Sequence, residues 1–225
     1  MTPHVINVRL ARSYQEQAAS LAYSHDAMHT WQRVVKRVTD FVCALLGLVL
    51  LSPVFLVIAI VMKTQKNGPI IFRQERIGYG GKPFTIYKFR TLSTVVEDEG
   101  PQLIAKSDSV KSTRFERYLR EHHLDELPQL WNVLRGDMSL VGPRPERKYY
   151  INQIMEHTHD YLLIYQMRPG LTSEATLYNG YTDTMEKMLK RLDMDIRYLE
   201  NRSLGLDMKI ILATIYGMVT SLREK

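Results

Sequence analysis

Two adjacent carboxylates and several cations are the residues of this chain best suited to chemistry on a phosphate. Asp125 and Glu126 stand directly before an apolar segment, and cationic side chains occur on both sides of them in the sequence. Two unit charges 4 Å apart repel by about 4 kcal/mol at an effective dielectric constant of 20, so a carboxylate attacks a phosphate only where cations or a divalent metal offset that repulsion. The candidates for this task are Lys88, Arg90, Arg120 and Arg144.

Each of these residues also has an ordinary structural interpretation, which the pattern leaves open. An acidic pair ahead of an apolar helix is usually a cap, favoured by the helix dipole. Lys88 and Arg90 alternate with apolar residues and share one face of a strand, as on any exposed sheet face. Arg144 stands between two prolines on a stiff loop, which suits a phosphate clamp or a surface ion pair. Arg120, five residues before Asp125, could approach it or lie on a helix surface.

A β-hairpin and several helices are expected to position these residues. Alternating segments at 69–74 and 84–90 flank a turn rich in glycine, which predicts the hairpin. Hydrophobic periodicity predicts helices over 114–121, 125–134, 146–167, 185–200 and 206–222. Asp125 is placed to cap the second of these, and Gly136 to end it. The predicted fold class is therefore α+β and mostly helical, with a small hairpin.

An apolar run over residues 41–62 is interrupted near its middle by Ser52 and Pro53. About 22 helical residues at 1.5 Å each would just cross the hydrocarbon core of a bilayer, but an interior proline breaks the helical hydrogen bonding. Cationic residues flank both ends, whereas a spanning helix normally has them at its cytoplasmic end. A re-entrant helix that bends at Ser52-Pro53 explains both features. The pattern alone also allows a single spanning helix with a proline kink.

The charge of the chain is concentrated beside this apolar run. The net charge is +6, and the segment from Lys63 to Leu92 contains seven cations and one carboxylate, so the remainder is balanced. Such a block suits anionic headgroups or a phosphate-bearing substrate, or it is a solvated tether. No nucleic-acid-binding module accompanies it, so no nucleic acid is predicted as a partner. The single cysteine, Cys43, excludes an intrachain disulfide, and the first thirty residues predict no cleavable signal peptide.

Together the motifs give a specific resemblance over residues 31–220. The chain resembles the bacterial sugar transferases, which are monotopic phosphoglycosyl transferases that act on polyprenyl phosphate. The motifs that carry the resemblance are Lys36-Arg37-Val38-Thr39-Asp40, the Ser52-Pro53 break, Gly68-Pro69-Ile70-Ile71-Phe72-Arg73-Gln74-Glu75-Arg76-Ile77-Gly78, Lys88-Phe89-Arg90-Thr91, Leu124-Asp125-Glu126-Leu127-Pro128-Gln129-Leu130, Asn132-Val133-Leu134-Arg135-Gly136-Asp137-Met138-Ser139, Val141-Gly142-Pro143-Arg144-Pro145 and Arg168-Pro169-Gly170-Leu171-Thr172. The chain departs from the family at Ser173-Glu174, where a glycine usually follows, and this puts the substrate contacts of that loop in question.

The resemblance implies an enzyme that moves a sugar 1-phosphate from a UDP-sugar onto undecaprenyl phosphate and releases UMP. It implies a covalent phosphosugar ester on Asp125, with Glu126 as its catalytic partner, and a Mg²⁺ ion held by the two carboxylates. The cations at the four positions above match substrate-binding residues of the family, and Asp195 matches a carboxylate of its C-terminal helical region. It also favours the re-entrant form of the apolar segment.

The predicted organisation follows from the same resemblance. An N-terminal extension covers 1–30, a re-entrant membrane helix 31–66, and a cytoplasmic catalytic domain with interfacial helices 67–225. The expected location is the cytoplasmic face of a bacterial inner membrane, at the initiating step of exopolysaccharide, capsule or glycoconjugate synthesis. The expected partners are the UDP-sugar, undecaprenyl phosphate, the membrane and downstream glycosyltransferases. The alternative hypothesis is a catalytically inactive membrane scaffold for those later glycosyltransferases.

Overall fold

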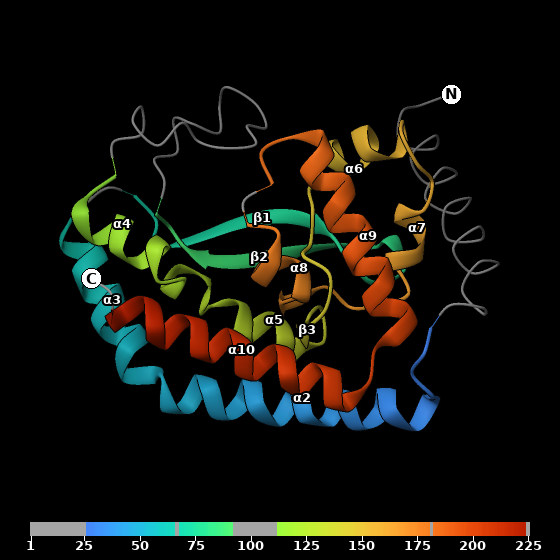
Figure 1. The fold of residues 1–225 in the computed structure, drawn as a ribbon. Coiled ribbons are helices and arrows are strands. Elements are labelled where there is room, and N and C mark those ends of the chain that lie inside the picture. Colours follow the sequence, from blue (N-terminus) through green and yellow to red (C-terminus); the bar gives the residue numbers. More distant parts are fainter. Residues whose placement is uncertain (1–25, 66–67, 92–111, 181, 224–225) are drawn as a thin grey trace, which may run out of the picture.

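The computed structural model describes residues 26–65, 68–91, 112–180 and 182–223. Most of the predicted N-terminal extension, and the polar segment 93–111, for which the sequence predicts a loop or a short helix, therefore lie outside the described residues. Figure 1 shows a long bent helix pair along one side, with a hairpin and the remaining helices above it. The elements are α2 (Thr30–Leu50), α3 (Ser52–Thr64), β1 (Ile71–Ile77), β2 (Pro83–Phe89), α4 (Arg114–Glu121), α5 (Gln129–Arg135), β3 (Ser139–Val141), α6 (Lys148–Met155), α7 (Tyr161–Ile164), β4 (Gly170–Thr172), α8 (Glu174–Tyr178), α9 (Met185–Asn201) and α10 (Leu204–Arg223), with short 3₁₀ turns η1 (Tyr79–Gly81) and η3 (Leu124–Glu126).

The predicted break in the apolar segment is confirmed at Ser52-Pro53. Helices α2 and α3 meet at Leu51 with a bend of 57°. The Ser52 hydroxyl donates a hydrogen bond of 2.8 Å to the carbonyl oxygen of Val49. Pro53 lies in the first turn of α3, where its missing N–H is not needed. Within the described residues no single helix is long and apolar enough to cross a membrane, whereas α2 and α3 together meet that requirement by length and composition.

Helix α2 is docked on the rest of the molecule through three charged residues of one sequence motif. The Lys36 ammonium lies 2.6 Å from a carboxylate oxygen of Asp207 in α10. Arg37 donates hydrogen bonds of 2.6 and 2.9 Å to two carbonyl oxygens near the end of α5. The buried carboxylate of Asp40 accepts a 3.0 Å hydrogen bond from the backbone N–H of Leu140 in β3. The apolar segment is therefore held in place by polar contacts near its N-terminal end.

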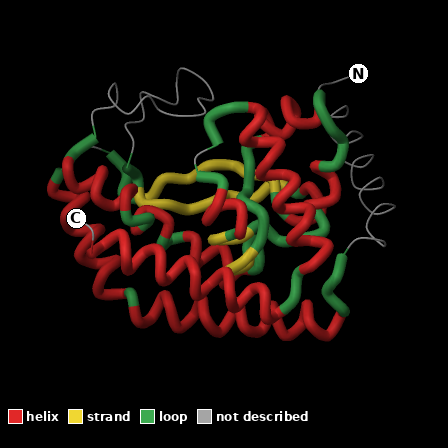
Figure 2. The backbone as a smooth tube through the Cα atoms, in the orientation of Figure 1, coloured by secondary structure: helices red, strands yellow, loops and turns green. Residues whose placement is uncertain are grey.

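The predicted hairpin is confirmed, and a second small sheet accompanies it. Strands β1 and β2 are antiparallel, with Phe72 opposite Lys88. Strands β3 and β4 form a parallel pair that the sequence analysis missed, because three residues each are too few for a recognisable alternation. Figure 2 shows the hairpin lying among helices, with the short parallel pair between it and α2. The mixed helix and strand architecture agrees with the predicted α+β class.

Two of the predicted helices have different boundaries in the structure. The helix expected over 146–167 is divided into α6 and α7, because Thr158 and Asp160 form a local side-chain-to-backbone turn that competes with helical bonding. The helix expected from Asp125 begins instead at Gln129, as α5. Its N-cap position is occupied by Pro128, and no side chain caps it. The prediction that Asp125 caps this helix was therefore wrong.

Two glycines bring the loop after β3 into backbone contact with β4. A Cβ atom on Gly142 would lie 2.3 Å from the carbonyl oxygen of Arg168, and one on Gly170 would lie 2.2 Å from the nitrogen of Gly142. Neither distance is possible for a real side chain. The glycines of the Val141–Pro145 and Arg168–Thr172 motifs are thus required by one close backbone approach, which also positions Arg144 two residues further on.

Replacing Gly142 with alanine should lower the free energy of unfolding by about 3 kcal/mol, because the strands must separate to admit the methyl group. Activity should fall as well, since the loop carries Arg144. Gly205→Ala in α10 is the control: the nearest atom to its added Cβ would be 3.9 Å away, so stability should be unchanged or slightly higher. Urea unfolding of the two variants measures the difference, and equal stability would contradict this account of the glycines.

Candidate active site

The two candidate carboxylates lie on a tight turn between α4 and α5. Asp125 and Glu126 belong to η3, and the backbone N–H of Glu126 donates a 3.2 Å hydrogen bond to the carbonyl oxygen of His123. His123 has φ 54°, the single positive φ of a non-glycine residue in the part of the chain that the structure describes. Such a left-handed conformation is strained and is common near functional sites. The turn presents the two carboxyl groups to different surroundings.

Glu126 is ionised and holds two cations. One of its carboxylate oxygens, Oε1, lies 2.7 Å from the Lys88 ammonium and 2.9 Å from the Arg144 guanidinium. Burial alone would raise the pKa of Glu126, but the attraction of Arg144 and then Lys88 outweighs it and holds that pKa well below its usual range. Lys88 comes from β2 and Arg144 from the loop after β3, so the folded chain assembles this group from three separate segments.

Asp125 is in the opposite electrostatic state. Its residue is 7% exposed, and burial raises the pKa of its carboxyl group to about 7, although Lys88 partly opposes the shift. The structure gives Asp125 no ion pair within 4 Å among the described residues. Glu126 therefore binds the two cations, while Asp125 has a pKa near neutrality and no cation paired with it among the described residues. A pair of neighbouring carboxyl groups with separated pKa values is a recognised sign of a catalytic site.

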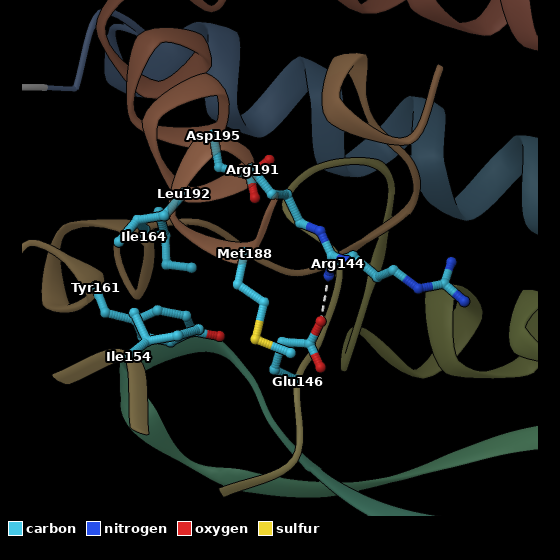
Figure 3. A pocket seen from close by; sticks show the side chains of 9 residues that line it. All are labelled: Arg144, Glu146, Ile154, Tyr161, Ile164, Met188, Arg191, Leu192 and Asp195. Atoms are coloured by element: carbon cyan, nitrogen blue, oxygen red, sulfur yellow. Dashed lines mark hydrogen bonds and ion pairs between the residues drawn. The ribbon is translucent and has the colours of Figure 1, made fainter. Parts of the chain in front are cut away.

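A small pocket with a mixed polar and apolar lining adjoins Arg144. It lies between α6, α7, α9 and the loop after β3, and has room for about one water molecule. Its polar lining consists of Arg144, Glu146, Tyr161, Arg191 and Asp195. In Figure 3, the Glu146 carboxylate pairs with Arg191 of α9, while the Arg144 guanidinium extends away from the pocket. The same loop thus connects the carboxylate pair to α9.

Asp195 lines this pocket, and its carboxyl group is protonated at neutral pH. Burial raises the pKa of its carboxyl group to about 8, although Arg191 one turn earlier partly opposes the shift. The residue is 3% exposed. Its protonated carboxyl group could donate a hydrogen bond into the pocket, which an ionised carboxylate cannot do.

The raised pKa of Asp195 predicts a pH-dependent effect of removing it. The unfolded chain loses this proton near pH 4 and the folded protein only near pH 8, so the residue destabilises the fold increasingly as the pH rises between these values. Asp195→Asn should therefore be more stable than the parent by an amount that grows by up to about 1.4 kcal/mol per pH unit and levels off above pH 8. Urea unfolding across this range measures it. Asp193→Asn, at a 57% exposed side chain on the same helix, should give a flat difference, and an equally flat Asp195 result would contradict the assignment.

The structure brings four of the predicted site residues together and separates the others. Asp125, Glu126, Lys88 and Arg144 form the cluster described above. Arg90 instead pairs with the carboxylate of Glu116 at 3.8 Å, with both residues 4% exposed, and ties the end of the hairpin to α4.

The two remaining predicted residues lie outside the cluster. Arg120 offers its backbone oxygen to His123, but its side chain forms no ion pair among the described residues. Asp195 lines the pocket that Arg144 borders. Sequence analysis missed Glu146 and its partners Arg191 and Arg76, which hold the loop of Arg144 in place. The position of Glu146 directly after the motif that contains Arg144 was the one available signal.

The departure from the family pattern at Ser173-Glu174 has a local structural cause. Ser173 is the N-cap of α8, and its hydroxyl oxygen accepts a 2.9 Å hydrogen bond from the backbone N–H of Thr176. Glu174 is in the first turn of this helix, where a negative charge is favoured by the helix dipole. Ser173 and Glu174, which stand where the family usually has a glycine, thus begin helix α8.

The carboxylate pair fits a metal ion that arrives together with phosphates. No group of three or more metal-ligating side chains occurs in the described ranges. Asp125 and Glu126 supply two carboxylates, although Lys88 and Arg144 already occupy one oxygen of Glu126. Mg²⁺ commonly binds one or two protein carboxylates and completes its shell with phosphate oxygens and water. The residues present therefore suit Mg²⁺ bound jointly by protein and substrate.

Comparisons with known proteins match this architecture. A family model described as "Bacterial sugar transferase" matches residues 31–221. A UDP-glucose:undecaprenyl-phosphate glucose-1-phosphate transferase of Klebsiella pneumoniae is 42% identical over 185 residues, covering 81% of this chain and 40% of that protein. A protein of the same name from Caulobacter vibrioides is 43% identical, with 83% and 70% covered.

A related protein is named for a different sugar. A UDP-N-acetylgalactosamine-undecaprenyl-phosphate N-acetylgalactosaminephosphotransferase of Aeromonas hydrophila is 36% identical, covering 83% of this chain and 44% of that protein. The chain thus spans about two fifths of the length of several relatives that it matches. The matched region includes the carboxylate pair, the hairpin and the loop of Arg144.

Proposed function

The chain belongs to the bacterial sugar transferase family, and on this premise we propose that it transfers a sugar 1-phosphate from a UDP-sugar to undecaprenyl phosphate and releases UMP. This reaction would initiate the synthesis of an exopolysaccharide, capsule or glycoconjugate. The observation that best supports the proposal is the difference in ion pairing between the two carboxylates. Glu126 is committed to Lys88 and Arg144, whereas Asp125 has no ion pair among the described residues and is available as a nucleophile.

The proposed reaction has two displacements at one phosphorus atom. In the first, a carboxylate oxygen of Asp125 attacks the phosphorus that bears the sugar, the bond to the bridging oxygen breaks, and UMP leaves. In the second, a phosphate oxygen of undecaprenyl phosphate attacks the same phosphorus. The bond between phosphorus and Asp125 breaks, so the carboxylate is regenerated and the lipid-linked diphosphosugar is formed. Each step exchanges one P–O bond for another and needs no oxidant or external proton donor.

The cations beside the carboxylate pair would make this attack possible. Arg144 is always charged and can bind phosphate oxygens in pairs, whereas Lys88 is a compact point charge. Burial lowers the pKa of Lys88, although Glu126 opposes that shift. Mg²⁺ held by the carboxylates would supply further neutralisation of the diphosphate when bound. The pocket of Asp195 has room for about one water molecule, so Asp195 is proposed to act on donor binding indirectly, through the loop of Arg144 that borders the pocket. The buried pairing of Arg90 favours a structural role for that residue.

A membrane location is supported by the exposed apolar surface of the bent helix pair. Large apolar side chains on α2 and α3 are more than half exposed, among them Leu46, Leu50, Leu56 and Val57. Helix α10 lies beside α2 and adds exposed apolar residues such as Leu212 (Figure 1). Many exposed large apolar side chains on one pair of helices are typical of contact with a membrane or a partner. We therefore propose that α2 and α3 form a re-entrant anchor on the cytoplasmic face of the bacterial inner membrane.

This topology predicts that both ends of the α2–α3 pair face the cytoplasm. Cysteines introduced singly at Thr30 and Thr64, with Cys43 replaced, should both resist a membrane-impermeant thiol reagent in intact cells and react after lysis. Labelling of only one of them in intact cells would show a true span. Pro53→Ala should shift the pair toward spanning, because a continuous helix satisfies its own backbone hydrogen bonds in lipid.

Release of UMP tests the proposed function against the inactive-scaffold alternative. Purified protein with undecaprenyl phosphate and Mg²⁺ is offered UDP-glucose and UDP-N-acetylgalactosamine separately, and UMP and lipid-linked sugar are measured. The proposal predicts both products with at least one donor, loss of both in excess chelator, and recovery with added Mg²⁺ but poorly with Ca²⁺. UMP release unchanged by chelator would remove the metal from the proposal, and no product with any UDP-sugar would favour the scaffold.

A further inference from the structure

Gln129 lies one turn after the carboxylate pair, at the start of α5, and is buried. The N–H groups of Glu126, Leu127, Leu130 and Trp131 each donate to the carbonyl oxygen three residues earlier, so η3 runs on closely into α5. Residues three apart along such a helical segment are neighbours, which places Gln129 next to both Glu126 and Asn132. Glu126 contacts β2 through Lys88, and the side chain of Asn132 bonds the backbone of Tyr87 and Thr85 in the same strand. Gln129 lies between these two residues in the sequence.

The amide of Gln129 has an unused donor. The residue is 2% exposed, and its Nε2 atom has no hydrogen-bond partner among the described residues. A buried unpaired donor is destabilising, and native proteins retain few of them. The two hydrogen bonds that Glu126 accepts both end on its Oε1 atom, which leaves Oε2 for another donor. The unpaired donor of Gln129 and this second carboxylate oxygen of Glu126 therefore belong to residues one turn apart.

Substrate binding would change the partners of Glu126. The inference here rests on the proposed function, in which the donor diphosphate lies beside the carboxylate pair. Its phosphate oxygens would compete with Glu126 for Lys88 and Arg144, because both cations are within 3 Å of the same carboxylate oxygen before substrate arrives. Glu126 has a side chain only 12% exposed, so water cannot fully replace the cations that turn away.

We propose that Gln129 is a positioning residue that stabilises Glu126 during this exchange. When Lys88 and Arg144 turn toward the phosphates, the Nε2 amide of Gln129 donates a hydrogen bond to Oε2 of Glu126. The free energy needed to release the cations is lowered, and diphosphate binds more tightly. This role explains why Nε2 of Gln129 is unpaired in the substrate-free protein, because Oε2 of Glu126 needs a new donor only after the cations have turned away.

A comparison of two glutamine-to-methionine variants separates this role from a structural one. Methionine keeps the length of the side chain and removes the donor. Gln129→Met should leave the melting temperature of the substrate-free protein unchanged or raise it, because an unpaired buried donor is removed. It should weaken binding of inorganic diphosphate about tenfold and slow single-turnover UMP release. Gln166→Met is the control: both amide atoms of Gln166 are likewise buried and without hydrogen-bond partners among the described residues, and this residue follows α7, away from the carboxylate pair.

Calorimetric titration of the full chain with inorganic diphosphate, together with thermal unfolding, gives both readouts. Diphosphate binding by Gln129→Met within twofold of the parent would overturn the proposal. So would a loss of stability, or failure to fold, in both Gln129→Met and Gln129→Leu, because the substrate-free protein would then already need the amide. If the parent itself binds neither diphosphate nor UDP, the proposed function fails and this inference fails with it. If the parent binds and the variants bind equally well, only the role of Gln129 is lost.

Discussion

Replacing Asp125 with asparagine should abolish turnover and leave the protein folded. Removal of a covalent nucleophile commonly lowers kcat by a factor of about 10³ or more, and an amide of the same shape cannot form the ester. Because burial raises the pKa of Asp125 to about 7, its carboxylate is costly to keep ionised above that pH. At pH 8 the asparagine variant should therefore unfold at the same temperature as the parent or a higher one. UMP release and thermal unfolding, measured on the same preparation, check both parts.

Asp193→Asn is the matched control for this variant. It makes the same chemical change at a side chain that is 57% exposed on α9 and pairs with Arg197 one turn later. Its turnover and melting temperature should both match those of the parent, since exposed ion pairs contribute little. Near-normal turnover in Asp125→Asn would show that another group forms the ester, or that the sugar phosphate passes directly to the lipid.

Replacing Glu126 with glutamine should destabilise the protein by about 3 kcal/mol. Lys88 and Arg144 would lose their shared anion, and removing one partner from a buried ion pair typically costs 3–5 kcal/mol. The lower end applies because the Arg144 side chain is 37% exposed. Inorganic diphosphate should restore part of the loss and stabilise this variant more than it stabilises the parent, because the anion replaces the missing carboxylate. Urea unfolding with and without diphosphate measures the effect.

An exposed ion pair provides the comparison for Glu126. The carboxylate of Asp183 pairs with Lys187, and their side chains are 35% and 45% exposed. Asp183→Asn should change the free energy of unfolding by less than about 1 kcal/mol and should not respond to diphosphate. If Glu126→Gln is as stable as the parent, or if diphosphate stabilises both equally, the two cations do not depend on Glu126 as described.

The sequence predicted the parts of this fold that have strong local signals. The hairpin was expected from alternation around a glycine-rich turn, and helices α4 and α9 from hydrophobic periodicity. The break in the apolar segment was expected from Pro53, whose effect on a helix is local. The parallel pair β3–β4 could not be predicted, because two three-residue strands are joined by a close approach of Gly142 and Gly170 that only the folded backbone reveals.

The sequence predicted which residues form the candidate site, but not how their charges pair. Asp125 and Glu126 are neighbours in the sequence and looked equivalent there. Their difference arises because Lys88 and Arg144, which are 38 and 18 residues from Glu126, both approach the same carboxylate. Arg90 looked equivalent to Lys88 on the alternating strand, yet its guanidinium pairs with α4. Tertiary packing decides such pairings, and no local pattern reports them.

A phosphosugar covalently attached to Asp125 is the proposed intermediate of the reaction. The direct measurement is mass spectrometry of the protein after incubation with Mg²⁺ and UDP-glucose or UDP-N-acetylgalactosamine, without undecaprenyl phosphate. The peptide containing Asp125 should gain the mass of one phosphosugar. Added undecaprenyl phosphate should remove this mass, and Asp125→Asn should never acquire it. A protein that turns over the donor but shows no such adduct, or carries it on another residue, would contradict the account.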